Sequence, residues 1–177
     1  LFSCSSHTAS VTCVRWGGRG LLYSASQDRT VKVWDAADGK LCRTLAGHAH
    51  WVNSLALCAE HALRTGAFDH LGEAPAEAEA RRARALERFE QAVAAHGGRE
   101  VLASGSDDHT VMLWHPESDK KAVARLTGHQ QLVNVVTFSP DAKWLASASF
   151  DKSVKLWNAL TGAFVATFRA HVEAVYQ

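Results

Sequence analysis

One unit of about 40 residues occurs three times in this chain, and this repeat restricts the possible folds more than any other feature of the sequence. Segments 21–48 and 144–171 align without a gap as "LLYSASQDRTVKVWDAADGKLCRTLAGH" and "WLASASFDKSVKLWNALTGAFVATFRAH". Between them lies "VLASGSDDHTVMLWHPESDKKAVARLTGH", which spans 101–129. A repeat of this length is typical of folds built from copies of one supersecondary unit.

The period of the repeat can be measured between the histidines that close each unit. His7, His48, His129 and His171 are separated by 41, 81 and 42 residues. Two of these separations fit the roughly 40 to 45 residues of a four-stranded propeller blade, and the middle one is a blade plus about 40 further residues. We therefore expect one repeat to carry an insertion.

Within each unit the residues alternate between apolar and polar, as in "TVKVW" and "SVKLW". This period of two predicts strands. The segments "QDRT", "DDHT" and "FDKS" have the composition of tight turns, and Gly39 and Gly162 stand in later turns where a positive φ is convenient. The sequence therefore predicts an all-β protein.

The unit resembles the WD-repeat β-propeller family. The resemblance rests on "GH" at 47–48 and 128–129, on the central Asp of each unit, and on Trp34-Asp35. Two units depart from the closing pair with Trp114-His115 and Trp157-Asn158. The resemblance implies that residues 1–177 form a partial propeller of about three full blades plus the start of another.

Each unit also repeats four polar residue types at fixed spacing. The family resemblance implies that they form a structural hydrogen-bond network in each blade: His7, Ser24, Asp28 and Trp34; His48, Ser104, Asp108 and Trp114; His129, Ser147, Asp151 and Trp157. The same residue types occur in Ser/His/Asp catalytic triads. Three copies of a catalytic site would be unusual, whereas every blade must satisfy its own buried polar groups. We expect no catalytic residue and no enzymatic activity.

Composition excludes few functions. The formal charge of +1 gives no overall basic field for nucleic acid, and no apolar run approaches the roughly 18 residues that span a bilayer. We expect no membrane contact, metal, cofactor or small-molecule substrate. The four cysteines, which form no CxxC pair, are expected to be reduced core thiols: Cys4, Cys13, Cys42 and Cys58. The first residue is Leu1, and "HVEAVYQ" at the end looks like the start of a strand, so we expect an excerpt of a longer protein.

Residues 70–100 are expected to form a helical insertion within the second blade. A helix is predicted from Pro75 to His96, ending before Gly97-Gly98, with a narrow apolar stripe of Leu86, Phe89 and Val93. Two interpretations stay open. The helix is either a solvated excursion packed lightly on the propeller edge, or a contact for a protein partner or RNA through Arg81, Arg82, Arg84 and Arg88. Six acids and five bases between Glu73 and Glu100 weaken a contact driven by phosphate alone.

Two segments compete to be the second strand of the interrupted blade. "ALRTGAFDH" at 62–70 aligns with "LLYSASQDR", and Asp69 follows His48 by 21 residues, as Asp28 follows His7. "VLASGSDDHTVMLW" supplies the same strand again, with the correct step from Asp108 to Trp114. We favour Val101 to Ser106 over Ala62 to Ala67, because it is continuous with its partner strand.

Loops at the ends of propeller strands form the faces on which partners bind. Aromatic residues dominate binding hot spots, so Trp51 and Phe150 are candidate anchors. Other polar residues occupy similar places and complete the candidate set: Gln27, His50, Asp107, Gln130 and Glu173. Each could equally be an ordinary loop or strand-end residue, and core packing is as good an explanation for Trp51 as exposure.

Within the family, the chain is similar to WD-repeat factors that assemble the large (60S) ribosomal subunit. This similarity rests on "HWVNSLAL", on "ALRTGAF" just before the insertion, and on "SGSDDHTVMLW". It implies a nucleolar or nuclear scaffold that binds pre-large-subunit particles, with their ribosomal proteins, ribosomal RNA and assembly factors. It also implies engagement of the midasin ATPase through an amino-terminal domain absent from these residues, and a link to Notch signalling. The alternative is a generic adaptor, such as a ubiquitin-ligase substrate receptor or a signalling scaffold.

Overall fold

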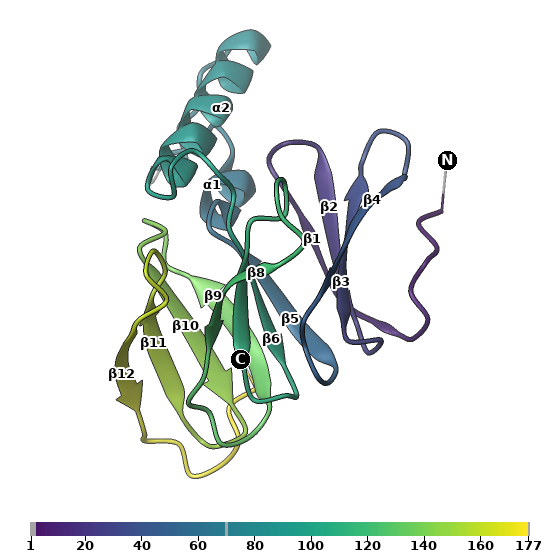
Figure 1. Cartoon of the computed structure of the whole chain (residues 1–177). Coiled ribbons are helices and arrows are strands. Elements are labelled where there is room, and N and C mark those ends of the chain that lie inside the picture. Colours follow the sequence, from purple (N-terminus) through teal and green to yellow (C-terminus); the bar gives the residue numbers. More distant parts are fainter. Residues whose placement is uncertain (1–2, 70, 177) are drawn as a thin grey trace.

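Three four-stranded antiparallel sheets follow one another along the chain in the computed structural model, which describes residues 3–69 and 71–176 (Figure 1). We call them blades 1, 2 and 3. Blade 1 contains β1 (Val11–Trp16), β2 (Leu21–Ser26), β3 (Thr30–Asp35) and β4 (Leu41–Ala46). Blade 2 contains β5 (Val52–Leu57), β6 (Leu102–Ser106), β7 (Val111–Trp114) and β8 (Ala122–Leu126). Blade 3 contains β9 (Val133–Phe138), β10 (Trp144–Ser149), β11 (Val154–Asn158) and β12 (Phe164–Phe168).

The blades are arranged side by side around their first strands. β5 contacts both β1 and β9, so the first strand of each blade lies on the inner side of the arc. One apolar core lies between blades 1 and 2, where Val31, Val33 and Leu45 meet Val52 and Leu55. A second core fills the space between blades 2 and 3. The predicted all-β partial propeller with a helical insertion in one blade is confirmed.

The two ends of the arc expose positions that the middle of the arc buries. Leu45 and Leu126 are buried by the blade that follows them, whereas Phe168, at the equivalent place in blade 3, is exposed. Val52 and Val133 are buried, whereas the equivalent Val11 of blade 1 is exposed. Burial at these positions therefore depends on a neighbouring blade.

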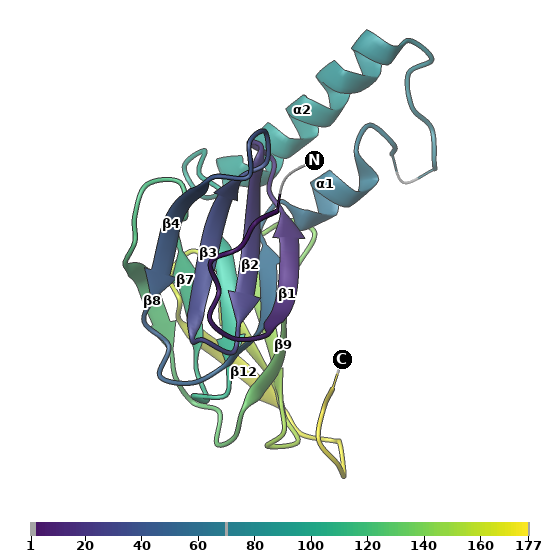
Figure 2. The same ribbon diagram turned by 90° about the vertical axis from the view of Figure 1, so that its right-hand side faces the viewer.

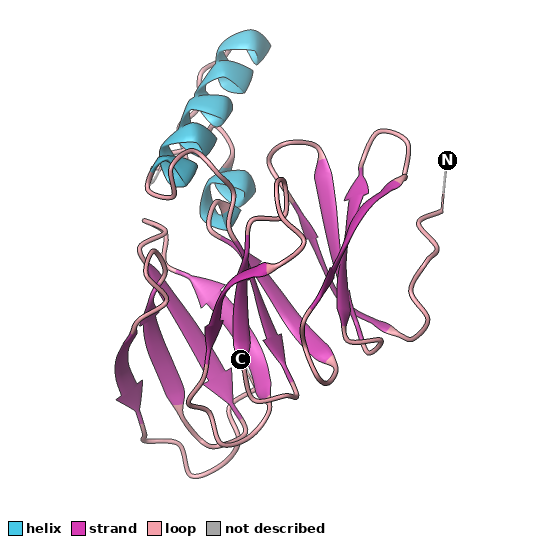
Figure 3. Ribbon diagram, viewed as in Figure 1, coloured by secondary structure: helices cyan, strands magenta, loops and turns pink. Residues whose placement is uncertain are grey.

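Both helices lie between β5 and β6, at one end of the strands (Figure 3). They are α1 (Glu60–Thr65) and α2 (Ala78–Ala94). Between the two candidate segments, the structure selects β6 as the second strand of blade 2, paired with β5 and β7. Most of the rejected segment, Ala62 to Ala67, lies in α1. A tight turn joins β6 to β7, so this pairing needs no long loop closure.

The predicted helix start at Pro75 is wrong, because α2 begins at Ala78 with Glu77 in the extended N-cap position. The predicted apolar stripe is only partly correct. Phe89 and Val93 are buried in the second core, whereas Leu86 is 56% exposed. Figure 2 shows the reason: only the C-terminal half of α2 reaches the blades, and its N-terminal half projects into solvent. Residue 70, where the insertion was expected to start, lies outside the described residues.

The cysteines are all free, but they do not all lie in the core as expected. Cys58 is buried and Cys13 is half-buried, whereas Cys4 and Cys42 are exposed. Cys42 lies on β4, the outer strand of blade 1, whose first two residues are both exposed. No helix in the described parts of the chain is long and apolar enough to cross a membrane.

Candidate functional site

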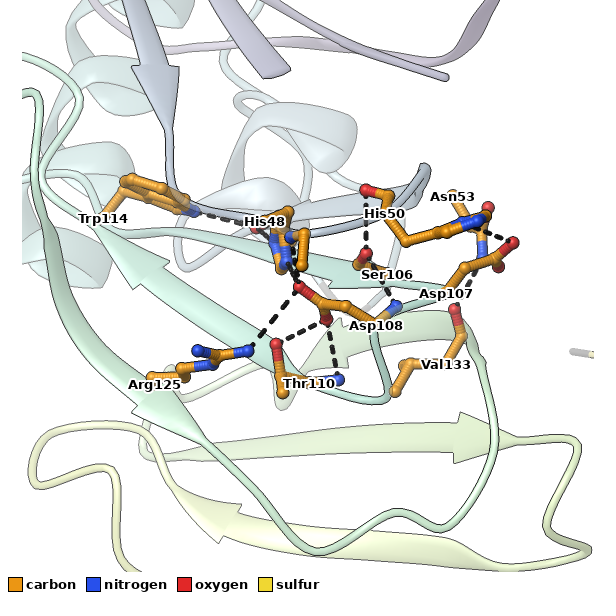
Figure 4. Close-up of polar contacts among 12 residues, drawn as sticks. His48, His50, Asn53, Ser106, Asp107, Asp108, Thr110, Trp114, Arg125 and Val133 are labelled. Carbon is orange, nitrogen blue, oxygen red and sulfur yellow. Dashed lines mark hydrogen bonds and ion pairs between the residues drawn. The ribbon is translucent and has the colours of Figure 1, made fainter. Parts of the chain in front are cut away.

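A chain of hydrogen bonds links four side chains in blade 2 (Figure 4). The indole N–H of Trp114 donates to Oγ of Ser104 over 2.8 Å, and Ser104 Oγ lies 2.7 Å from Nε2 of His48. Nδ1 of His48 lies 2.8 Å from a carboxylate oxygen of Asp108. With the proton of His48 on Nδ1, the hydroxyl of Ser104 donates to Nε2 of His48 and Nδ1–H donates to Asp108, so every donor in the chain has an acceptor.

The carboxylate of Asp108 also holds the tight turn between β6 and β7. It accepts hydrogen bonds from the backbone N–H groups of Ala49 and Thr110 and from the hydroxyl of Thr110. Burial alone would raise the pKa of Asp108, but the bonds from His48 and Thr110 hold it well below its usual range. Asp108 is therefore an ionised carboxylate whose oxygen atoms are occupied by the turn and the histidine.

The same chain occurs in the other two blades. In blade 1, His7 lies 2.7 Å from Asp28 and 2.8 Å from Ser24, to which Trp34 donates. In blade 3 all three distances, among His129, Asp151, Ser147 and Trp157, are 2.8 Å. The three serines are buried, so their hydroxyl groups offer no access to a substrate. We call each set of four linked side chains a fastener, because its hydrogen bonds hold one blade together.

The candidate partner-binding residues fall on two opposite ends of the strands. We call the end with the β2–β3, β6–β7 and β10–β11 turns the turn face, and the end with α1 and α2 the insertion face (Figure 1). Loops at the turn face carry most of the candidates: Gln27, His50, Trp51, Asp107, Gln130 and Phe150. Glu173 lies in the terminal segment, whose Val175 N–H donates to Ser149 at that face. The four arginines lie on α2 and are separated from this group.

On the turn face of blade 2, the polar side chains of His50, Asn53 and Asp107 lie together (Figure 4). The side-chain amide of Asn53 donates to Oδ1 of Asp107 over 2.6 Å and to the carbonyl of Val133 over 3.0 Å. Nδ1 of His50 lies 3.3 Å from Oδ2 of Asp107. The His50 ring is 5.3 Å from the ring of Trp51, which is 45% exposed, so exposure rather than core packing describes Trp51.

The neighbouring candidates of blade 3 are less open. Phe150 is half-buried and meets the ring of Tyr176 edge-on at 4.9 Å. Gln130 is exposed, and its backbone N–H donates to Asp151. Gln27 of blade 1 is half-buried beside the first fastener.

Three of the four arginines on α2 contact the insertion itself. Arg88 donates to the carbonyls of Gly66 and Phe68, and Arg84 lies 3.5 Å from the carboxylate of Asp69. Arg81 donates to the carbonyl of Ala76 over 2.9 Å. Arg82 is exposed and has no polar partner among the described residues. This arrangement favours a structural role over a phosphate-binding row.

Sequence reasoning missed Glu100, which is 0% exposed although it is acidic. Its carboxylate accepts hydrogen bonds from Tyr23 Oη over 2.9 Å and from the backbone N–H of Gly18 over 3.2 Å, both in blade 1. Burial raises its pKa. Arg19 strengthens the same junction by donating to the carbonyl of Gly98. Glu100 is the last residue of the insertion, and no local pattern marks it.

No group of three or more His, Cys, Asp or Glu side chains that could hold a metal ion is present in the described part of the chain. The polar groups of the fasteners are already occupied by hydrogen bonds within each blade. The turn face of blade 2, with an exposed indole beside a carboxylate, is therefore the site best suited to contact another molecule.

The model of the family described as "WD domain, G-beta repeat" matches residues 1–35, 91–115 and 120–158. Ribosome assembly protein 4 of Saccharomyces cerevisiae is 51% identical over 169 residues, which cover 94% of this chain and 33% of the relative. The Notchless protein homolog of Arabidopsis thaliana is 57% identical over 168 residues, covering 95% of this chain and 35% of the relative. The chain thus spans about a third of the length of the curated relatives it matches.

Solved structures with the same fold share much less sequence. The structure of U3-55K and the crystal structure of the RRP9 WD40 repeats both align with a TM-score of 0.69 at 22% identity. Each alignment covers 97% of this chain, and 43% and 42% of the respective structures. They support the propeller architecture described above.

Proposed function

The chain belongs to the WD40-repeat family, and on this premise we propose that it is a non-enzymatic scaffold in the assembly of the large (60S) ribosomal subunit. The observation that carries the proposal is the identity of 51–57% with Ribosome assembly protein 4 and the Notchless homolog, over 94–95% of this chain. WD repeat-containing protein srw1 of Schizosaccharomyces pombe is only 30% identical, over 89% of this chain. The likeness to the assembly proteins therefore exceeds what the repeat alone would produce.

The fasteners support a role without catalysis. The hydroxyl groups of Ser24, Ser104 and Ser147 are buried, and each already has an indole and an imidazole as partners. We infer that the twelve fastener residues stabilise the blades and take no part in chemistry. Exposed side chains between the fasteners are then left to bind other macromolecules.

We propose pre-large-subunit particles as the partners, with contacts to ribosomal proteins, ribosomal RNA and other assembly factors, in the nucleolus and nucleus. Residues 1–177 contribute a partial propeller, and residues 70–100 are an insertion within its second blade. Engagement of the midasin ATPase would use an amino-terminal domain outside these residues. The name of the Drosophila melanogaster relative, Protein Notchless, supports including a link to Notch signalling in the proposal.

Co-sedimentation tests the proposal. The tagged full-length product of the gene should migrate with large-subunit precursors when a nuclear extract is separated on a sucrose gradient. Replacing Trp51 and Phe150 with Ala should move protein into lighter fractions. The matched control replaces Val123 and Val165, two exposed apolar residues of outer strands, with Ala and should leave the profile unchanged.

A different profile would favour the rival function. If the wild-type protein sediments only in light fractions together with a ubiquitin ligase or signalling proteins, the ribosomal assignment is wrong. The generic adaptor would then be the better description, and the fold would be unaffected by the change.

A further inference from the structure

Equivalent positions of the three blades can be compared directly, because the fasteners are the same in each blade while other residues at the turn face differ. Two variable positions lie side by side at the turn face of every blade, joined by a backbone hydrogen bond. The N–H of Gln27 donates to Ser10, that of Asp107 donates to Trp51, and that of Phe150 donates to Leu132. These three pairs are polar in blade 1, aromatic and acidic in blade 2, and apolar in blade 3.

The charge of the adjoining turns differs in the same way. The three-residue segments that start at Gln27, Asp107 and Phe150 have formal charges of 0, −2 and 0 with histidine neutral. Blades 1 and 3 offset the fastener aspartate with Arg29 and Lys152, whereas blade 2 has His109 at that place. Arg125 lies 3.9 Å from the fastener carboxylate of Asp108 rather than beside Asp107. Blade 2 is therefore the anionic part of the turn face.

Asp107 still has capacity to accept hydrogen bonds. Oδ1 accepts from Asn53 and Oδ2 faces His50, so each oxygen retains a lone pair for a further donor. Asn53 is itself anchored on the carbonyl of Val133, which fixes the carboxylate between blades 2 and 3. The indole of Trp51 is exposed on the adjacent loop, and Asp107 and Trp51 are joined through their backbones.

We propose that this site, formed by Trp51, Asp107, His50 and Asn53, receives an arginine side chain from a protein partner. A guanidinium can stack on an indole and donate to a carboxylate at the same time. The apolar and aromatic side chains next to this site then suit an apolar residue of the same partner segment: Leu132, Phe150 and Tyr176. This inference specifies the partner chemistry of the turn face and so rests on the proposed scaffold function.

The same charges disfavour a nucleic-acid backbone at this site. Phosphate groups would have to approach the carboxylate of Asp107, and the Arg125 guanidinium of the same blade lies 3.9 Å from the other acid of the turn, Asp108. Arg29 and Lys152, which could bind phosphate, belong to the flanking blades. A protein segment with a cation is therefore the partner that fits blade 2.

The probe is the peptide acetyl-Gly-Arg-Gly-Leu-Gly-amide, titrated into the full 177-residue chain and followed through the indole N–H signal of Trp51 in NMR spectra. The signal is assigned by its loss in Trp51→Phe. Its citrulline analogue keeps the shape of arginine without the charge. We expect the arginine peptide to shift the signal and the analogue to bind about fivefold more weakly or worse.

Asp107→Asn should weaken binding of the arginine peptide by a similar factor, because it removes the charge and keeps the side-chain shape. Asp119→Asn, which removes an exposed acid from the opposite end of the strands, is the matched control and should bind as the wild type does. Thermal unfolding of both variants verifies that they are folded.

Three results would overturn the inference: no shift with the arginine peptide, equal binding of the citrulline analogue, or binding insensitive to Asp107→Asn. A ten-nucleotide uridine RNA that shifts the Trp51 signal in a manner dependent on Arg29 and Lys152 would also overturn it. Failure of the peptide test with intact co-sedimentation would leave the scaffold function standing, so the two proposals can be separated.

Discussion

Gly18 lies directly against the ring of Phe89, so that a methyl group added at Gly18 would be 2.1 Å from ring carbon Cε2. The first residue belongs to the loop between β1 and β2 of blade 1, and the second to α2 of the insertion in blade 2. The contact therefore docks the insertion on the neighbouring blade. Glu100, whose carboxylate accepts a hydrogen bond from the N–H of Gly18, holds the same loop.

Gly18→Ala is expected to destabilise the protein by about 1–3 kcal/mol, because the methyl group forces the Phe89 ring out of its place. Urea unfolding measures the change in the free energy of unfolding. In a Phe89→Ala background the same substitution should cost little, since the ring is gone. A full cost in that background would show that the contact does not dock the helix.

Asp151→Ala is expected to lower the free energy of unfolding by about 1.5–3 kcal/mol, because charge-assisted bonds to His129 and the turn are lost. Burial would raise the pKa of Asp151, but bonds from Ser153, Gln130 and His129 hold it below its usual range. The carboxylate thus stabilises the fold above its unfolded pKa of about 3.9, and this contribution is lost as the pH falls through the folded value. Chemical unfolding from pH 7 to pH 3 checks both effects. A difference between wild type and variant that grows toward acid would contradict the assignment.

Unlike Asp151→Ala, Glu100→Gln is expected to stabilise the protein. The melting temperature at pH 7.5 should rise by roughly 2–4 °C, the shift that about 1 kcal/mol produces in a chain of this size. Burial raises the folded pKa of Glu100, so the neutral acid suits the site. The stabilisation contributed by the protonated Glu100 side chain is fully present below the unfolded pKa of about 4.3 and is lost as the pH rises through the pKa of the folded state. Calorimetry at pH 7.5 and pH 5 should show the advantage of Gln shrinking at the lower pH. Glu90→Gln, at an exposed glutamate of α2, serves as control, and a Glu100→Gln variant that is less stable than the wild type at both pH values would refute the prediction.

Arg88→Ala is expected to loosen the segment from Gly66 to Asp69, because Arg88 donates to the carbonyls of Gly66 and Phe68. Amide hydrogen exchange at these residues should become faster, whereas blade strands such as β6 keep their protection. Arg82→Ala removes an equal charge from the exposed side of the same helix. It should change amide exchange neither in the segment from Gly66 to Asp69 nor in the blade strands. Equal effects of the two substitutions would mean that charge, and not the specific contact, holds the segment.

Several features could be predicted because they depend on residues that are close in sequence or repeated in it. The step of six residues from Asp108 to Trp114 recurs in all three units, and the turns at Asp28, Asp108 and Asp151 share one geometry with a positive φ at the next residue. Chain continuity also selected β6 correctly over the segment that became α1. The exposure of Leu86 could not be predicted, since helical periodicity reports which face of a helix is apolar but not how far the helix extends beyond its support.

The burial of Glu100 is the clearest example of a feature that the sequence does not predict. Its partners Tyr23 and Gly18 are 77 and 82 residues away along the chain, and they meet it only because blades 1 and 2 pack together. The sequence by itself determined the repeating unit, its strands and turns, and the place of the insertion, because each follows from local spacing and composition. Only the tertiary structure decided which side chains are buried between blades, and that Trp51 and the arginines of α2 lie at opposite ends of the strands. These properties arise from contacts between distant segments, and no local pattern encodes them.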